Sequence, residues 1–150
     1  MNYVDYDFKF AKLILHEMEI RKEIEDILKT TNLKLGRNVK PSPSKVLQEA
    51  FAKNGWQIEY QVTEKSSHLK FDLYKKKAAI EVQLTDPSDC YNDYLKFLLA
   101  YNVGRIEVGI EIVYERTVEG KNLPKIEKVK NDLDIYRRVI PCPIWVIGLK

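Results

Sequence analysis

The segment 70–84, KFDLYKKKAAIEVQL, decides how the centre of this chain folds. It holds two strand-like runs, 69–74 and 78–84, that are separated only by three consecutive lysines. So short a separation favours an antiparallel hairpin, because antiparallel strands can be joined by a tight turn. One acidic residue lies inside each apolar run, Asp72 in the first and Glu81 in the second. The hairpin therefore predicts two carboxyl groups on neighbouring strands.

These two carboxyl groups suit a divalent cation. Side chains alternate across a strand, so Glu81 and Gln83 share one face, and a hairpin closed at the lysines brings Asp72 to the same place. Ionised carboxylates held together repel one another, and a bound divalent cation removes that repulsion. Hard oxygen ligands suit Mg²⁺, with Mn²⁺ as a substitute. The predicted metal ligands are Asp72, Glu81 and the backbone carbonyl of Val82.

A cation held in this way predicts hydrolysis of a phosphodiester. It would polarise the phosphate and lower the pKa of a bound water that attacks phosphorus. The Gln83 amide would orient that water, although it is no strong general base. We therefore predict that Asp72, Glu81 and Gln83 are catalytic. The same spacing also fits two solvent-facing acidic residues, each opposite a lysine, and the spacing alone leaves both interpretations open.

The rest of the chain predicts an α/β fold with a central mixed sheet flanked by helices. Its core order is α-β-β-β-α-β. The predicted elements around the hairpin are helices at 8–28, 43–54, 86–102 and 131–138 and strands at 56–63, 106–113 and 144–149. Ser42 and Pro43 form the N-cap and first position of the second helix. The third helix is expected to bury an apolar face of Tyr91, Tyr94, Leu95, Leu98 and Leu99.

Length and composition indicate one domain, 1–150, of a globular protein. The chain is 45% hydrophobic and 31% charged, and no segment approaches the roughly 20 apolar residues that span a bilayer. Residues 1–10 lack the basic start and apolar stretch of a secretion signal, which predicts a cytoplasmic protein with reduced cysteines. A net charge of +3 and a pI near 8.7 fit a polyanionic partner without deciding it.

Some polar residues have both a structural and a functional interpretation. The lysines Lys75, Lys76 and Lys77 fit a solvated hairpin tip as well as a contact with DNA phosphates. His68 has no second histidine or cysteine at the spacing of a zinc site. It lies close to Asp72 in sequence and is therefore a candidate contact for a substrate phosphate.

The segment 70–111 resembles the BglII-type restriction endonucleases, a branch of the PD-(D/E)XK nuclease superfamily in which Glu-x-Gln replaces the usual Glu-x-Lys. The resemblance is carried by Phe71-Asp72, Ala79-Ile80-Glu81-Val82-Gln83, a helix with Tyr91, Asp93 and Tyr94, the segment Val103-Gly104-Arg105-Ile106-Glu107-Val108-Gly109-Ile110-Glu111, and an upstream Val46-Leu47-Gln48-Glu49-Ala50 that leads to Asn54-Gly55-Trp56. It implies a restriction-endonuclease-like core. By that resemblance Asp72 and Glu81 match the metal ligands and Gln83 takes the place of the superfamily lysine. Gln48 or Glu49 would be an accessory group.

The resemblance implies a metal-dependent endonuclease acting on double-stranded DNA, a type II restriction endonuclease. A homodimer is expected, because a two-fold protein places two equivalent centres on a duplex, and the first long helix is the expected contact surface. The chain has little room for the base-reading loops of the longer restriction enzymes. A structure-specific repair or recombination nuclease is therefore one alternative. A non-catalytic DNA-binding or regulatory protein is another.

Overall fold

The strands of the computed structural model, which describes residues 1–36, 38–116 and 122–150, form one mixed sheet. Its strand order is β1-β6-β5-β4-β3-β2. The strands are β1 (Tyr3–Phe8), β2 (Gln57–Thr63), β3 (Ser66–Lys75), β4 (Ala78–Val82), β5 (Val108–Tyr114) and β6 (Ile144–Leu149). The helices are α1 (Ala11–Glu17), α2 (Arg21–Thr30), α3 (Pro43–Ala52), α4 (Asp89–Asn102) and α5 (Ile126–Ile135). The predicted α/β fold is confirmed, and its core order runs from α3 to β5.

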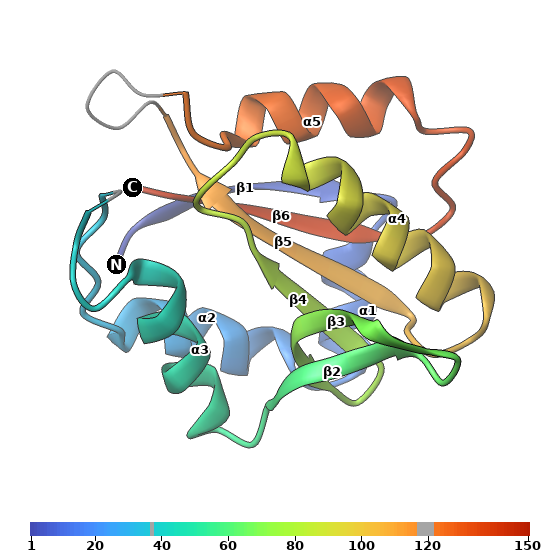
Figure 1. Ribbon diagram of the computed structural model, residues 1–150, viewed down its shortest axis with the longest axis horizontal. Helices are drawn as coiled ribbons and strands as arrows, with labels where there is room; N and C mark the ends of the chain where they lie inside the picture. The colour runs from blue at the N-terminus through green and yellow to red at the C-terminus, as the bar shows by residue number, and fades with distance from the viewer. Residues whose placement is uncertain (37, 117–121) are drawn as a thin grey trace.

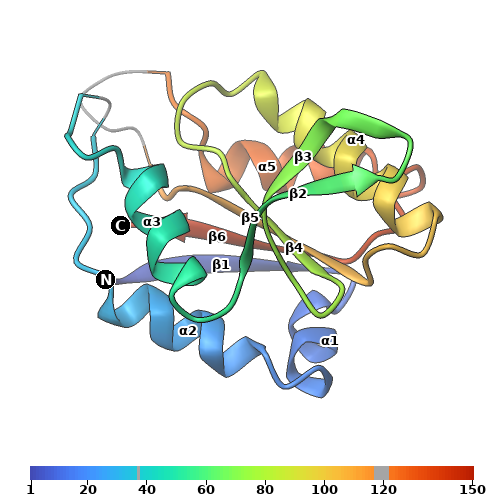
Figure 2. The ribbon, with the colours of Figure 1, turned by 60° about the horizontal axis from the view of Figure 1, so that its bottom comes forward.

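Helices cover both faces of the sheet, with α1, α2 and α3 on one face and α4 and α5 on the other (Figures 1 and 2). Buried apolar residues form two clusters, one with α1 to α3 that includes Ile80 and Ile110, and one with α4 and α5 that includes Phe71 and Val146. The strands β4, β5 and β6 run parallel and are buried throughout. A charged side chain in these strands is therefore removed from water.

The predicted hairpin is confirmed as the antiparallel pair of β3 and β4. Lys76 and Lys77 form its turn with φ angles of 49° and 64°, the left-handed conformation that tight hairpin turns require. Phe71 and Leu73 belong to different core clusters, on opposite faces of the sheet. Strict alternation would place both on one face, so β3 twists at Asp72, where its ladder with β4 ends.

The predicted helix over 8–28 is wrong, because the N-terminus forms β1 and two short helices instead. The helices α1 and α2 are separated near Glu19, whose φ of 61° lies in the left-handed region and ends the first helix. β1 pairs antiparallel with β6 at the sheet edge. Its Asp5 carboxylate accepts a hydrogen bond from Trp145 Nε1 at 2.8 Å, so this polar strand is held partly by side chains.

Element boundaries elsewhere differ by a few residues from those predicted. α5 begins at Ile126 and not at 131, and β5 begins at Val108 and not at 106. In β2 the alternation fails at Ile58, which is exposed because Glu59 has a φ of 53°. Ser42 does cap α3 through its side chain, as predicted. Within the described parts of the chain, no helix has the length and apolar character needed to cross a membrane.

The predicted apolar face of α4 is wrong as well. The buried residues of this helix are Cys90, Asp93, Tyr94, Phe97 and Ala100. Of the predicted face, Tyr94 is buried and Leu98 half-buried, whereas Tyr91, Leu95 and Leu99 are exposed. The face of α4 that packs against the sheet thus includes the carboxylate of Asp93, while an apolar stripe of the helix is exposed to solvent.

Gly109 on β5 sets how closely α4 approaches the sheet. A Cβ at this position would lie 2.8 Å from Phe97 Cδ1, closer than van der Waals contact allows. We predict that Gly109→Ala lowers the free energy of unfolding by about 1–3 kcal/mol, measured by urea denaturation. The double variant with Phe97→Leu should lose less than the sum of the single changes, because the smaller side chain makes room. Additive losses would contradict this packing argument.

Candidate active site

The β3–β4 hairpin brings the carboxyl groups of Asp72 and Glu81 together. Strand pairing runs from the turn to Leu73 opposite Ile80, and the next position on each strand holds one of the two acidic residues. Burial and the neighbouring Asp93 raise the pKa of Glu81, and the charge of Asp72 adds to this rise, so the two carboxyl groups lie close to each other. Asp72 Oδ2 accepts a hydrogen bond from the backbone N–H of Val82 at 2.8 Å. The two carboxyl groups are thus neighbours at the end of the β3–β4 ladder.

Helix α3 contributes Gln48, whose side chain lies close enough to Asp72 to act against the rise that burial causes in the pKa of that carboxyl. Its neighbour Glu49 is exposed and lines a separate hollow together with Ile27 and Lys53. Successive residues of a helix point about 100° apart, so the two side chains cannot both face the hairpin. Of the two predicted accessory residues, the structure brings Gln48 to the acidic pair and leaves Glu49 outside.

Helix α4 contributes Asp93 and Lys96, which stand three residues apart on the face toward the sheet. Lys96 Nζ lies 2.5 Å from Glu81 Oε1 and 3.0 Å from Asp93 Oδ1. It also donates a hydrogen bond to the backbone carbonyl of Lys70 at 3.3 Å. Only 16% of the Lys96 side chain is exposed. A positive charge therefore lies among the carboxylates beside the hairpin.

Gln83 lies just beyond the end of β4, and both the nitrogen and the oxygen of its side-chain amide form hydrogen bonds. Its Nε2 donates to Asp93 Oδ2 at 3.3 Å, and its Oε1 accepts from Thr85 Oγ1 at 3.0 Å. The predicted neighbourhood of Gln83 and Glu81 is therefore observed, with Asp93 as the link between Gln83 and Lys96.

A further carboxylate, Glu111 on β5, pairs in parallel register with Glu81. Its side chain is fully buried, and neither carboxylate oxygen has a hydrogen-bond partner among the described residues. Such a group costs free energy when ionised, because nothing replaces the water it has lost. Asp72, Glu81, Asp93 and Glu111 are together called the acidic cluster below.

Burial and mutual repulsion make the acidic cluster hard to ionise. Burial raises the pKa of Glu81 well above its usual value, and the neighbouring Asp93 raises it further. Burial likewise raises the pKa of Asp72 and of Asp93, while Lys96 acts against the shift in both. Burial alone would lower the pKa of Lys96, but attraction to Glu81 and Asp93 outweighs it and raises that pKa. One ammonium group thus balances part of the charge of four carboxyl groups.

The donor set of the acidic cluster fits a hard divalent cation. Several carboxylate oxygens converge, and Glu81 Oε1 has no well-oriented hydrogen bond among the described residues despite its short ion pair with Lys96. In the described ranges, however, no three acidic, histidine or cysteine side chains stand in a ready metal-binding arrangement. The oxygen ligands therefore suit a divalent cation. In the structure, however, the positive charge beside Glu81 is the ammonium group of Lys96.

The remaining predicted site residues lie away from the acidic cluster. Lys75 Nζ is 2.9 Å from a Glu23 carboxylate oxygen and is committed to that ion pair. The turn lysines 76–77 are exposed at the opposite end of the hairpin from Asp72. His68 is exposed and precedes Asp72 by four residues on β3, about 13 Å along an extended strand.

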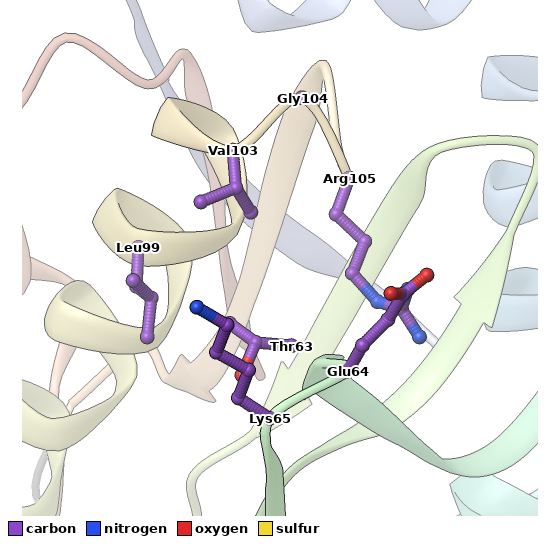
Figure 3. Close-up of a pocket in the computed structure, with 7 residues that line it drawn as sticks. All are labelled: Thr63, Glu64, Lys65, Leu99, Val103, Gly104 and Arg105. Carbon is purple, nitrogen blue, oxygen red and sulfur yellow. The ribbon is translucent and has the colours of Figure 1, made fainter.

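A hollow of about 550 Å³ lies between the β2–β3 turn and the C-terminal end of α4 (Figure 3). It is lined by Thr63, Glu64, Lys65, Leu99, Val103, Gly104 and Arg105. None of these residues belongs to the acidic cluster. The candidate active site is thus defined by converging charged groups and not by this hollow.

Three residues of the site were given no role from the sequence, Asp93, Lys96 and Glu111, although Asp93 and Glu111 lie in segments that carry the family resemblance. Glu111 stands between Ile110 and Ile112 on a strand, the same pattern that singled out Glu81. Asp93 interrupts a buried helical stripe, a signal that was hidden because the wrong face of α4 was expected to be buried. Lys96 has no signal of its own, since a lysine three residues after an aspartate also fits an exposed helix.

Comparisons with known proteins place this chain in a family. A family model described as restriction endonuclease BglII/BglIII matches residues 3–149. The fold is similar to a crystal structure of restriction endonuclease BglII complexed with a DNA 16-mer, with a TM-score of 0.81 and 16% identity over 99% of this chain and 76% of that one. It is also similar to free BglII, with a TM-score of 0.76 and 20% identity over 100% of this chain and 80% of that one. No curated protein sequence matches the chain. The match over nearly the whole sequence shows that the chain belongs to the BglII/BglIII family of restriction endonucleases.

Proposed function

We propose that the chain, as one nuclease domain over 1–150, is a Mg²⁺-dependent type II endonuclease that hydrolyses phosphodiester bonds of double-stranded DNA. The observation that carries the proposal is the convergence of the Asp72 and Glu81 carboxyl groups beside Gln83 in a member of this family. The BglII structure with bound DNA supports DNA as the substrate class. A cytoplasmic location is part of the same proposal.

In the proposed mechanism Asp72, Glu81 and the Val82 carbonyl would hold Mg²⁺ or Mn²⁺. The bound ion would supply charge stabilisation at the phosphate and a water of lowered pKa. Gln83 carries two N–H groups on Nε2 and uses one on Asp93, so the second remains for the attacking water or a phosphate oxygen. Gln48, which lies beside Asp72, would help to orient that carboxylate.

The test of this function is incubation of the purified chain with supercoiled plasmid DNA, with Mg²⁺ and separately with EDTA. Discrete fragments that appear only with Mg²⁺ are expected. Nicks confined to branched or single-stranded regions would show that the protein is a structure-specific nuclease and not a restriction endonuclease. Binding without cleavage in Mg²⁺ and in Mn²⁺ would refute the catalytic role.

We propose further that the active form is a homodimer. Apolar side chains are exposed on α4 and after α5, and they include Leu95 at 61% and Val139 at 63%. Tyr91, Leu95, Tyr136 and Val139 line one hollow there. A second copy of the chain would cover this surface, since an apolar patch of this kind is typical of protein interfaces. This surface differs from the first helix expected from the sequence.

A pair of variants decides between the two dimer surfaces. Leu95→Asp is expected to raise the dimer dissociation constant by about 30-fold or more, because it buries an unpaired charge at the contact. Leu13→Asp, an equally exposed position on α1, is expected to leave it unchanged. Sedimentation velocity over a concentration series measures both. If the Leu13→Asp variant is monomeric and the Leu95→Asp variant is dimeric, the dimer contact lies on α1.

A further inference from the structure

Lys96 is enclosed by acceptors in a way that a surface lysine is not. Its ammonium contacts Glu81 and Asp93 at 2.5 and 3.0 Å and donates to the Lys70 carbonyl. These acceptors come from β4, from α4 itself and from β3. The side chain is thus directed into the acidic cluster from the helix that covers it.

The position of this ammonium conflicts with metal binding by Glu81. A metal ion needs a Glu81 oxygen at about 2.1 Å, and Oε1 already has a cation beside it. Two cations on one carboxylate oxygen repel each other strongly in a buried place. Glu81 Oε1 is also buried without a well-oriented hydrogen bond, so its contact with Lys96 is ionic and leaves the oxygen short of donors.

We propose, resting on the metal-dependent function above, that Lys96 is a built-in counter-cation that holds Glu81 in the metal-free protein and yields it to the divalent ion. Asp93 and the Lys70 carbonyl then retain the ammonium nearby. Lys96 is therefore a positioning residue whose charge opposes metal binding. The affinity of the site for metal is set by this competition as well as by its ligands.

The experiment measures binding of Ca²⁺, which takes the same oxygen ligands, by isothermal titration calorimetry. Lys96→Gln is expected to bind Ca²⁺ about tenfold more tightly than the unchanged chain, because a nearby positive charge is removed. Lys96→Arg keeps the charge and should stay close to the unchanged affinity. Lys12→Gln is the matched control, since Lys12 also has a 2.5 Å ion pair, with Asp5, and belongs to α1, the helix on the opposite face of the sheet from α4 (Figure 1).

Thermal unfolding separates this role from a purely structural one. Lys96→Gln should lower the Tm of the metal-free protein, and Ca²⁺ should restore more of it than it adds to the unchanged chain. A structural lysine would lower the Tm equally with and without Ca²⁺. If Lys96→Gln does not fold, Lys96→Gln with Asp93→Asn removes one charge of each sign. That variant is compared with Asp93→Asn alone and should again bind Ca²⁺ about tenfold more tightly.

The outcomes also separate this inference from the proposed function. Equal or weaker Ca²⁺ affinity in Lys96→Gln, with plasmid cleavage intact in the unchanged chain, overturns the inference alone. Tighter Ca²⁺ binding in a chain that cleaves no DNA refutes the nuclease and supports the counter-cation. A failure of every variant to bind Ca²⁺ overturns the inference as well.

Discussion

Glu81→Gln is expected to lower the rate of Mg²⁺-dependent plasmid cleavage by about 10³-fold or more, because the change removes a charged ligand and its charge stabilisation at the phosphate. The protein should remain folded. Glutamine has almost the volume of glutamate, and Lys96 keeps Asp93 and the Lys70 carbonyl as acceptors when the charge of Glu81 is removed. Asp72→Asn should have an effect of similar size on cleavage.

Cleavage rates are measured under single-turnover conditions, with DNA binding followed separately by gel shift in Ca²⁺. Glu107→Gln is the matched control, because Glu107 is an exposed glutamate that precedes β5. It should cleave at the unchanged rate. Full activity of Glu81→Gln would exclude the acidic pair as the cleavage centre, whatever the family of the chain.

Glu111→Leu is expected to raise the free energy of unfolding of the metal-free protein by about 1–4 kcal/mol at pH 8. The ionisable carboxyl of Glu111 is fully buried and has no hydrogen-bond donor in the described ranges. Burial, followed by repulsion from Asp93 and Glu81, raises the pKa of Glu111 well above its usual 4.5. An apolar side chain of similar volume removes this cost.

The gain from Glu111→Leu should depend on pH with a definite sign. Above the ordinary pKa of 4.5, the unfolded chain releases the Glu111 proton while the folded chain keeps it, so the unchanged protein loses stability as pH rises toward the raised pKa. The leucine variant lacks this loss. Its advantage should therefore shrink between pH 8 and pH 5, measured by urea denaturation in EDTA. An advantage that is constant with pH would show that Glu111 ionises freely, and Glu107→Leu serves as the exposed control.

The local sequence was sufficient to predict the hairpin and the pair of acidic residues on it. The lysine turn, Asp72 and Glu81 lie within twelve residues, so strand alternation and one tight turn relate them directly. The start of α3 was predictable for the same reason, because a cap and a proline act on the first helical turn. Gln48 followed from the family resemblance, while its choice over Glu49 needed the direction of α3.

Contacts that are distant in sequence were the ones that sequence reasoning missed. β1 is stabilised by pairing Tyr3 with Leu149, at the other end of the chain, and its own alternation of polar and aromatic residues is weak. The apolar stripe of α4 that seemed suited to the core is exposed, since Gly109 and Phe97 pack the opposite stripe against β5. When a helix has two apolar stripes, its own sequence does not determine which of them is buried.

The sequence by itself determined the two-strand unit that carries Asp72 and Glu81, because hydrophobic alternation and turn chemistry act over a few residues. Only the tertiary structure decided what surrounds that pair. Asp93, Lys96 and Glu111 reach it through the packing of α4 on the sheet and the parallel register of β5 with β4. Buried charges are balanced by the groups that the whole fold brings within a few ångströms of them. Local sequence patterns do not predict which groups these are.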